Sequence, residues 1–250
     1  MMFNDAAPMD YTSTPSTPGS IKWARAYNIG GSIIAWFGLA LQSVLSWTKA
    51  EGGGIYGIFI SLNYFTILSN LLIACVITAL ALDPVRDGAK FRWLRLGAIV
   101  QIVITGLVYN LILAPQYTPQ TAPTGWALVS TNILHVIVPL VAVVGWLIFG
   151  PRRRITNTVV FTILIIPVLW IIYTLIHGAL VPNSFSNTAV KDSFVSYPYS
   201  FINVDKLGYG TVTVNVLAIA IIGLAIGYLF MGLERLMSKA PGTAMDADKR

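Results

Sequence analysis

The sequence predicts an all-α polytopic membrane protein, a six transmembrane helix bundle with both termini in the cytoplasm. Of its 250 residues, 56% are hydrophobic and only 10% are charged, whereas about a quarter of the residues in a soluble domain are charged. A membrane-spanning helix needs about 20 apolar residues, and a β-barrel would instead show short segments of alternating polarity. Six uncharged stretches meet the helical requirement: 27–47, 56–82, 96–114, 126–150, 155–179 and 209–232.

The 16 Lys and Arg residues are divided unevenly between the loops. Only Lys49, Lys191 and Lys206 fall on the outer side, so the positive-inside rule places both termini in the cytoplasm. The net charge of +6 therefore sets topology and attracts anionic lipid headgroups on the cytoplasmic side, rather than nucleic acid. The cytoplasmic set is Lys22, Arg25, Arg86, Lys90, Arg92, Arg95, Arg152, Arg153, Arg154, Arg235, Lys239, Lys249 and Arg250.

The chain divides into one helical domain and two tails. Residues 1–21 are rich in Ser, Thr, Pro, Asp and Gly, which predicts a disordered cytoplasmic tail without a cleavable signal peptide. Residues 22–238 form one six-helix transmembrane domain, because no internal repeat of the transporter kind is evident, and residues 239–250 form a cytoplasmic C-terminal tail. The single Cys75 excludes an internal disulfide and is predicted to be a small core residue.

The first three segments carry small or polar residues on one face. Gly30 and Gly31 allow another helix to approach the first segment closely. On the second and third segments, polar side chains recur at helical spacing, and such faces should point into the bundle because lipid offers them no partner. They are Asn63, Thr66, Ser69 and Asn70 on the second segment, and Gln101, Thr105, Tyr109 and Asn110 on the third.

The last three segments show similar features. On the fourth, Thr131 and Asn132 lie one turn above His135, and Pro139 and Pro167 interrupt the fourth and fifth segments. Gly223 and Gly227 give the sixth a small-xxx-small spacing. The polar face of the fifth consists of Trp170, Tyr173, Thr174 and His177.

The long outer loop at 181–208 is unusually aromatic. It contains Tyr197, Tyr199 and Phe201, which is too many rings for a purely solvated segment. We expect either a lid that lies on the outer membrane interface or a passive interfacial loop.

His135 is the histidine that lies deepest in apolar sequence, and an unpaired ionisable group there costs several kcal/mol. Its candidate partner is Thr66 on another segment. From a helical rise of about 1.5 Å per residue, Thr66 lies roughly 15 Å and His135 roughly 13 Å below the outer surface. Pro139 has no N–H, so it leaves the carbonyl of His135 without its helical donor.

This pair predicts nucleophilic chemistry, because a Thr hydroxyl needs a base to take its proton and neutral imidazole is the usual base. None of the six segments contains a carboxylate, so a carboxylate triad would require a loop residue such as Asp192 or Asp205. Structural hydrogen bonding of Thr66 and His135 is the alternative. The side chains predicted to support the substrate or the oxyanion are Asn63, Ser69, Asn70, Asn110, Asn132, Tyr173 and His177.

No cofactor and no metal site is predicted. His177 lies more than a turn shallower than His135, which disfavours haem ligation by both residues. Two histidines without a nearby carboxylate also make a poor zinc site.

Three short motifs together resemble one protein family. They are Tyr64-Phe65-Thr66-Ile67, Asn132-Ile133-Leu134-His135 followed by Pro139, and Tyr197-Pro198-Tyr199-Ser200-Phe201. Their order and spacing are similar to those of the androgen-induced gene product and the androgen-dependent TFPI-regulating protein, with related bacterial six-helix proteins. The resemblance covers most of the helical region, although each motif is short.

The resemblance implies a membrane-embedded hydrolase that cleaves fatty acid esters of hydroxy fatty acids. Thr66 matches the nucleophile position of that family, and His135 matches its histidine position. The chain departs from the animal proteins in that Pro139 follows His135 one residue sooner and the preceding asparagine is closer. Either a local bulge absorbs this change, or the histidine has moved around the helix.

The leading hypothesis is therefore an intramembrane lipid ester hydrolase in a bacterial plasma membrane, whose lipid substrate enters from the bilayer. One alternative is a proton-coupled small-molecule transporter that uses His135 as the proton-coupling group. The other is a haem- or quinone-binding membrane bundle.

Overall fold

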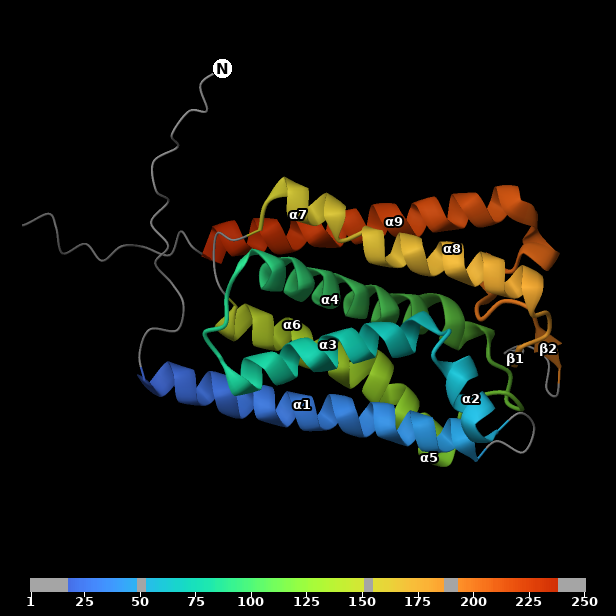
Figure 1. The fold of residues 1–250 in the computed structure, drawn as a ribbon, viewed down its shortest axis with the longest axis horizontal. Coiled ribbons are helices and arrows are strands. Elements are labelled where there is room, and N and C mark those ends of the chain that lie inside the picture. Colours follow the sequence, from blue (N-terminus) through green and yellow to red (C-terminus); the bar gives the residue numbers. More distant parts are fainter. Residues whose placement is uncertain (1–17, 49–52, 151–154, 187–192, 238–250) are drawn as a thin grey trace, which may run out of the picture.

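The fold is an all-α polytopic bundle, as the sequence predicts (Figure 1). The computed structural model describes residues 18–48, 53–150, 155–186 and 193–237. The predicted tails at 1–17 and 239–250 lie outside the described residues, whereas residues 18–21 belong to the first helix. Six helical segments are long and apolar enough to cross a membrane: Gly19–Trp47, Phe65–Leu82, Ala89–Gln116, Gly125–Phe149, Asn157–Leu180 and Val204–Met237.

The described ranges contain nine α-helices and four short helical turns. In chain order they are α1 (Pro18–Trp47), α2 (Gly54–Ser61), α3 (Phe65–Leu82), α4 (Ala89–Val108), η1 (Tyr109–Leu113), η2 (Ala114–Gln116), α5 (Gly125–Asn132), η3 (Ile133–Ile137), α6 (Val138–Phe149), α7 (Asn157–Thr162), α8 (Ile165–Leu180), η4 (Ser200–Ile202) and α9 (Val204–Met237). Before η4, the strands β1 (Phe185–Ser186) and β2 (Phe194–Val195) pair antiparallel.

The centre of the bundle is formed by α1, α3, α4 and α6. Helix α1 packs along α3, and α4 contacts α3, α6 and α9 (Figure 1). The backbones of α8 and α9 do not approach each other closely along their length. Most side chains of these two helices are exposed on the lateral surface, which in a membrane is the lipid-facing surface.

Several predicted segments are interrupted rather than continuous. The prediction of one helix over 56–82 is wrong, because the chain breaks between α2 and α3, where Tyr64 is extended at φ −76° and ψ 130°. The side chain of Asn63 donates to the Phe59 carbonyl at 2.9 Å, so it competes with the backbone for the last acceptors of α2. Helix α9 bends at Gly208, whose φ of 71° suits glycine.

Two packing predictions need correction. Cys75 was predicted to be a core residue, but it is exposed, on the face of α3 that points away from the core. A Cβ atom on Gly31 would lie 2.8 Å from Val141, whereas one on Gly30 would meet nothing within 4 Å. Of these two glycines, Gly31 is therefore the one that allows the close approach of α1 to α6.

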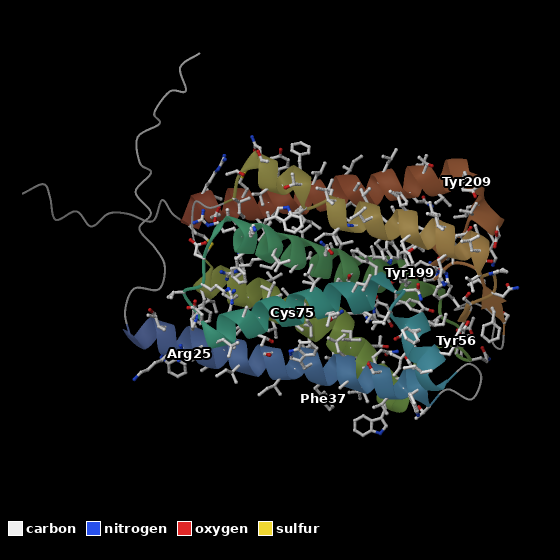
Figure 2. All side chains as sticks on the ribbon, in the orientation of Figure 1. Arg25, Phe37, Tyr56, Cys75, Tyr199 and Tyr209 are labelled. Atoms are coloured by element: carbon white, nitrogen blue, oxygen red, sulfur yellow. The ribbon has the colours of Figure 1, made fainter. Side chains whose placement is uncertain are left out.

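The two ends of the described chain lie at the same end of the bundle. Helix α1 begins and α9 ends at the left in Figure 1, whereas α2, β1 and β2 lie at the right. Figure 2 likewise shows Arg25 at the first end and Tyr56 and Tyr209 at the second. An even number of spans requires this arrangement of the ends.

The residues that follow β1 and are described from 193 to η4, which we call the lid, insert into the bundle. Tyr197, Tyr199 and Ile202 are buried. A Cβ atom on Gly178 would lie 2.2 Å from the ring of Tyr197, so this glycine lets the ring rest directly on α8. The lid is thereby part of the core at this end of the bundle.

Candidate functional site

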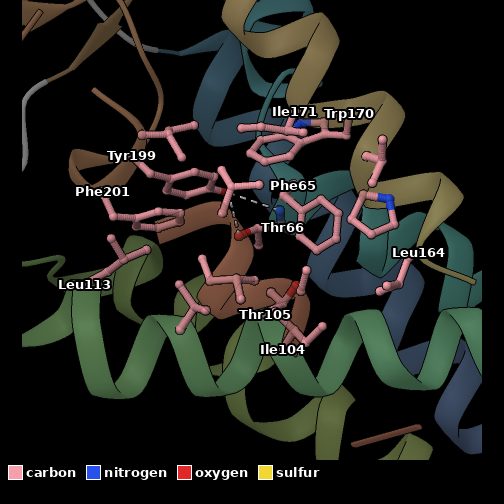
Figure 3. Close-up of a pocket in the computed structure, with 17 residues that line it drawn as sticks. Phe65, Thr66, Ile104, Thr105, Leu113, Leu164, Trp170, Ile171, Tyr199 and Phe201 are labelled. Atoms are coloured by element: carbon pink, nitrogen blue, oxygen red, sulfur yellow. Dashed lines mark hydrogen bonds between the residues drawn. The ribbon is translucent and has the colours of Figure 1, made fainter. Parts of the chain in front are cut away.

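Thr66 is the second residue of α3, at a helix N-terminus inside the bundle. The first N–H groups of a helix have no partner within the helix, and together they carry a partial positive charge. The N–H of Thr66 donates instead to the hydroxyl of Tyr199 at 3.2 Å (Figure 3). The break at Tyr64 therefore creates an electropositive position next to the Thr66 hydroxyl.

The structure brings Thr66 and His135 into contact. The Oγ1 atom of Thr66 lies 3.2 Å from Nε2 of His135. The other ring nitrogen, Nδ1, lies 2.9 Å from the carbonyl oxygen of Thr131. A carbonyl only accepts, so Nδ1 carries the proton, and Nε2 of the neutral ring accepts the hydroxyl proton of Thr66. With its protons placed in this way, the neutral ring is able to take the proton of the Thr66 hydroxyl.

A π-helical turn, η3, carries His135. Its one extra residue is a local bulge, the first of the two alternatives posed by the short spacing to Pro139. The carbonyl left free by Pro139 accepts from the Asn110 side chain at 3.3 Å. A Cβ atom on Gly106 would lie 3.0 Å from that same carbonyl, so α4 lies directly against this turn.

The face of the imidazole is also occupied. The ring of Tyr109 stacks on that of His135 with centroids 3.9 Å apart and planes 24° apart. Tyr109 belongs to the other π-helical turn, η1. Two π-helical turns therefore meet at the histidine, and such turns are frequent at functional sites.

Tyr199 is the principal residue that the prediction of the site missed. It is 8% exposed, and its hydroxyl lies 3.3 Å from Thr66 Oγ1 as well as accepting from the Thr66 N–H. Since the Thr66 proton goes to His135, the Tyr199 hydroxyl donates to Oγ1. Burial raises the pKa of Tyr199 to about 12, partly offset by the hydrogen bond with Thr66, so its hydroxyl stays a donor at neutral pH. The signal in the sequence is the high aromatic content of the loop.

Ser69 and Asn70 hold the backbone of Thr66. Both side chains donate to the Thr66 carbonyl, Ser69 at 3.1 Å and Asn70 at 2.8 Å. Asn70 also reaches the Leu134 carbonyl at 3.2 Å, which ties α3 to the turn that holds His135. Ser69 further bonds Thr105 on α4 at 2.8 Å. These residues position the pair and do not face a substrate.

Asn63 and Tyr173 form a separate contact at the helix break. The hydroxyl of Tyr173 donates to the side-chain oxygen of Asn63, and Trp170 donates to the Asn63 carbonyl at 3.0 Å. Asn110 bonds the His135 carbonyl, as described. Of the predicted oxyanion donors, Asn110 therefore bonds the backbone of His135, Asn63 bonds the backbone of α2, and Tyr173 bonds Asn63.

Three predicted partners do not reach the pair. Asn132 is exposed. His177 packs against the ring of Phe185 at 5.6 Å between centroids. Asp205 is exposed in the first turn of α9, and Asp192 lies outside the described residues. A backbone carbonyl, that of Thr131, orients the imidazole in place of a carboxylate.

Two cavities meet at Thr66. The outer cavity, of about 450 Å³, opens toward the end of the bundle that carries α2 and the lid, and His135 lines it. The second, of about 90 Å³, lies between α4, α8, α9 and the lid, and its wall is almost entirely apolar (Figure 3). Thr66 and Tyr199 line both cavities. The hydroxyl of Thr66 is therefore reachable from a polar side and from an apolar side.

Among the described residues, no cluster of three or more His, Cys, Asp or Glu side chains could hold a metal ion. Comparisons of the chain with family models, with curated proteins and with solved structures found no match. The chemistry of the site therefore has to be derived from its own geometry.

Proposed function

We propose that this chain is an intramembrane lipid ester hydrolase in which Thr66 is the nucleophile and His135 the base. The observation that carries the proposal is the 3.2 Å contact between Thr66 Oγ1 and Nε2 of His135, with Nδ1 held by the Thr131 carbonyl. Support comes from the resemblance of the three motifs to the androgen-induced gene product family. That resemblance also suggests fatty acid esters of hydroxy fatty acids as substrates.

The reaction proceeds in two halves. Nε2 of His135 takes the proton of Thr66 while Oγ1 attacks the ester carbonyl carbon, and the carbonyl oxygen becomes an oxyanion. The Tyr199 hydroxyl donates a hydrogen bond to that oxyanion, and the Thr66 N–H at the positive end of α3, which donates to the Tyr199 oxygen, strengthens this donor. His135 then gives its proton to the leaving alcohol oxygen. Water then attacks the acyl carbon while His135 takes one of its protons, and His135 returns that proton to Thr66 Oγ1 as the bond to the acyl group breaks and the carboxylic acid leaves.

The proposal includes a location. With the chain ends in the cytoplasm of a bacterium, the outer cavity opens to the outer face of the plasma membrane. The basic residues Arg86 and Lys90 are exposed near the opposite end, where they would contact anionic headgroups of the cytoplasmic leaflet. The lipid substrate comes from the bilayer, and the alcohol product leaves on the outer side.

The first test uses purified protein in detergent with a long-chain ester as substrate. Thr66→Ala and His135→Ala should each lower kcat by about 10² to 10⁴-fold, because each removes one half of a nucleophile and base pair. The matched control is Thr78→Ala on the same helix, whose hydroxyl bonds Ser32 at 2.8 Å and lies far from the site. The control should retain activity. Undiminished turnover in either site variant would show that the proposed mechanism is wrong.

The double variant sharpens the test. Groups that act as a unit give non-additive losses, so Thr66→Ala with His135→Ala should cost no more than the worse single change. Additive losses would mean that the two residues act independently. Thermal unfolding of every variant in the same detergent shows whether the fold persists.

Covalent labelling distinguishes the enzyme from its rivals. A fluorophosphonate probe should form an adduct on Thr66, and the labelled fraction should fall in His135→Ala, as expected for a hydroxyl that His135 activates. A proton-coupled transporter would instead show pH-dependent flux in proteoliposomes and no adduct. A haem-binding bundle would show a Soret band, although both ring nitrogens of His135 are already engaged by Thr66 and Thr131.

A further inference from the structure

The apolar cavity next to Thr66 accepts hydrocarbon and little else. Four of the residues that line it carry polar side-chain groups: Thr66, Thr105, Trp170 and Tyr199. The hydroxyl of Thr105 bonds Ser69 at 2.8 Å, the indole N–H of Trp170 donates to the Asn63 carbonyl, and the hydroxyl of Tyr199 bonds Thr66. No polar group of a ligand would find a free partner here except at Thr66 itself, so only an apolar chain fits.

The outer cavity is more polar than the apolar cavity. Its wall includes several hydroxyl groups, among them those of Ser46, Ser61 and Thr121. His135 lines this cavity and not the apolar one. The base must protonate the leaving alcohol and activate the water that follows, so the leaving oxygen has to face the outer cavity.

We propose that the apolar cavity binds the acyl chain of the ester and that the outer cavity receives its alcohol part. The orientation follows from His135: with the leaving oxygen on its side of Thr66, the chain attached to the carbonyl carbon points into the apolar cavity. This inference rests on the proposed hydrolase function. It goes further by assigning each half of the substrate to one cavity.

The acyl chain enters sideways from the bilayer. Val168 lines the apolar cavity and is 46% exposed on the lateral surface of α8. The backbones of α8 and α9 stay apart, and between them Val216 and Ile219 of α9 complete the wall. A lipid chain can therefore reach Thr66 from the hydrocarbon region without crossing water.

The experiment compares two alanines of α9. Ala220 lines the apolar cavity, whereas Ala218 is exposed on the lateral surface. Two ester series are assayed, one with a fixed alcohol and acyl chains from acetyl to palmitoyl, the other with a fixed acetyl group and alcohols of increasing length. In Ala220→Phe, kcat/KM for long acyl chains should fall roughly tenfold for about every two methylene groups displaced, while acetyl esters are spared. Ala218→Phe should keep the wild-type profile.

Two outcomes overturn the assignment. An unchanged acyl profile in folded Ala220→Phe would mean that the chain lies elsewhere, and a changed alcohol profile would mean that the substrate binds in the reverse sense. If the wild type does not hydrolyse acetyl esters, or if Thr66→Ala still hydrolyses them, the proposed hydrolase function itself is wrong.

A binding measurement tests the cavity without any turnover. A fatty acid brominated along its chain should quench the fluorescence of Trp170, which lines the cavity. The Trp170 signal is the difference between the protein and its Trp170→Phe variant. Quenching should be lost in Ala220→Phe and kept in Ala218→Phe, and equal quenching in both would exclude the cavity as a chain site.

Discussion

At the scale of single residues, the candidate site depends on where two protons lie. The Thr131 carbonyl keeps one proton on Nδ1 of His135, which leaves Nε2 to accept from Thr66. The Tyr199 hydroxyl then has its own proton directed at Thr66 Oγ1. A buried network of this kind is strong only when each member has a partner, and here a backbone carbonyl orients the imidazole in the way that a carboxylate does in a Ser-His-Asp triad.

Removal of the Tyr199 hydroxyl tests this network. Tyr199→Phe should lower kcat roughly 10² to 10³-fold with little change in KM, because a donor to the oxyanion acts mainly in the transition state. The ring would still pack between Trp170 and Phe201, so the protein should fold. The measurement is the steady-state hydrolysis of an acetyl ester.

The matched control is Tyr197→Phe, which removes a hydroxyl two residues away in the same lid. Tyr197 lines neither cavity, so its variant should keep wild-type kcat. Equal losses in the two variants would point to a loosened lid and against an oxyanion donor. A rise in KM without a fall in kcat for Tyr199→Phe would assign the hydroxyl to ground-state binding.

At the scale of elements, irregular turns deliver the functional groups. The break between α2 and α3 exposes a helix N-terminus beside Thr66, and the π-helical turns η1 and η3 turn Tyr109 and His135 toward each other. Regular helices would give neither the free N–H at Thr66 nor the free carbonyl at His135. Neighbouring elements satisfy these groups, which is the condition for irregular backbone inside a membrane bundle.

Adding one methyl group at Gly106 tests the contact of α4 with η3. Gly106→Ala places a Cβ 3.0 Å from the backbone oxygen of His135 and 3.3 Å from Pro139. Neither neighbour is a flexible side-chain end, so we expect about 1 to 3 kcal/mol of destabilisation and a loss of kcat as His135 shifts. Thermal unfolding and ester hydrolysis are measured on the same preparation.

Gly97→Ala on the same helix is the control. A Cβ there would meet its nearest atom at 3.6 Å, an ordinary contact. This variant should be neutral or gain up to about 1 kcal/mol from the higher helix propensity of alanine. If Gly106→Ala is as stable and as active as Gly97→Ala, the close packing of α4 on the histidine turn has no functional role.

At the scale of the whole molecule, the site lies near the end of the bundle opposite the start of α1 and the end of α9 (Figure 1). The positive-inside rule predicts that this is the outer end.

A single cysteine placed in a Cys75→Ser background reports the side of the membrane on which each loop lies. Gln120→Cys, in the loop before α5, should react in intact cells with a maleimide that does not cross membranes. Lys90→Cys, at the start of α4, should react only after permeabilisation. The reverse pattern would place the chain ends outside.

For the polar faces of the helices, the sequence predicts the inward position of the side chains but not the role of each one. Thr66, Ser69 and Asn70 of the second segment and Thr105 of the third do meet inside the bundle. Their inward position could be predicted because lipid gives a polar side chain no partner. The role of each side chain could not, since Asn132 and His177 satisfy the same pattern but turn away from the pair. Which of several polar groups meet depends on helix rotation and on local bulges.

The sequence alone determined the six apolar spans, the helical class and the candidate pair, because hydrophobic length and uncharged composition are properties of each segment by itself. Only the tertiary structure decided that α3 begins at Phe65, that Tyr199 inserts beside Thr66 and that an apolar cavity and a more polar one meet there. These features arise from contacts between segments far apart in the chain, such as residues 66 and 199. The free energy of such contacts outweighs the local helix propensity of each segment, and it cannot be derived from the sequence of any one segment.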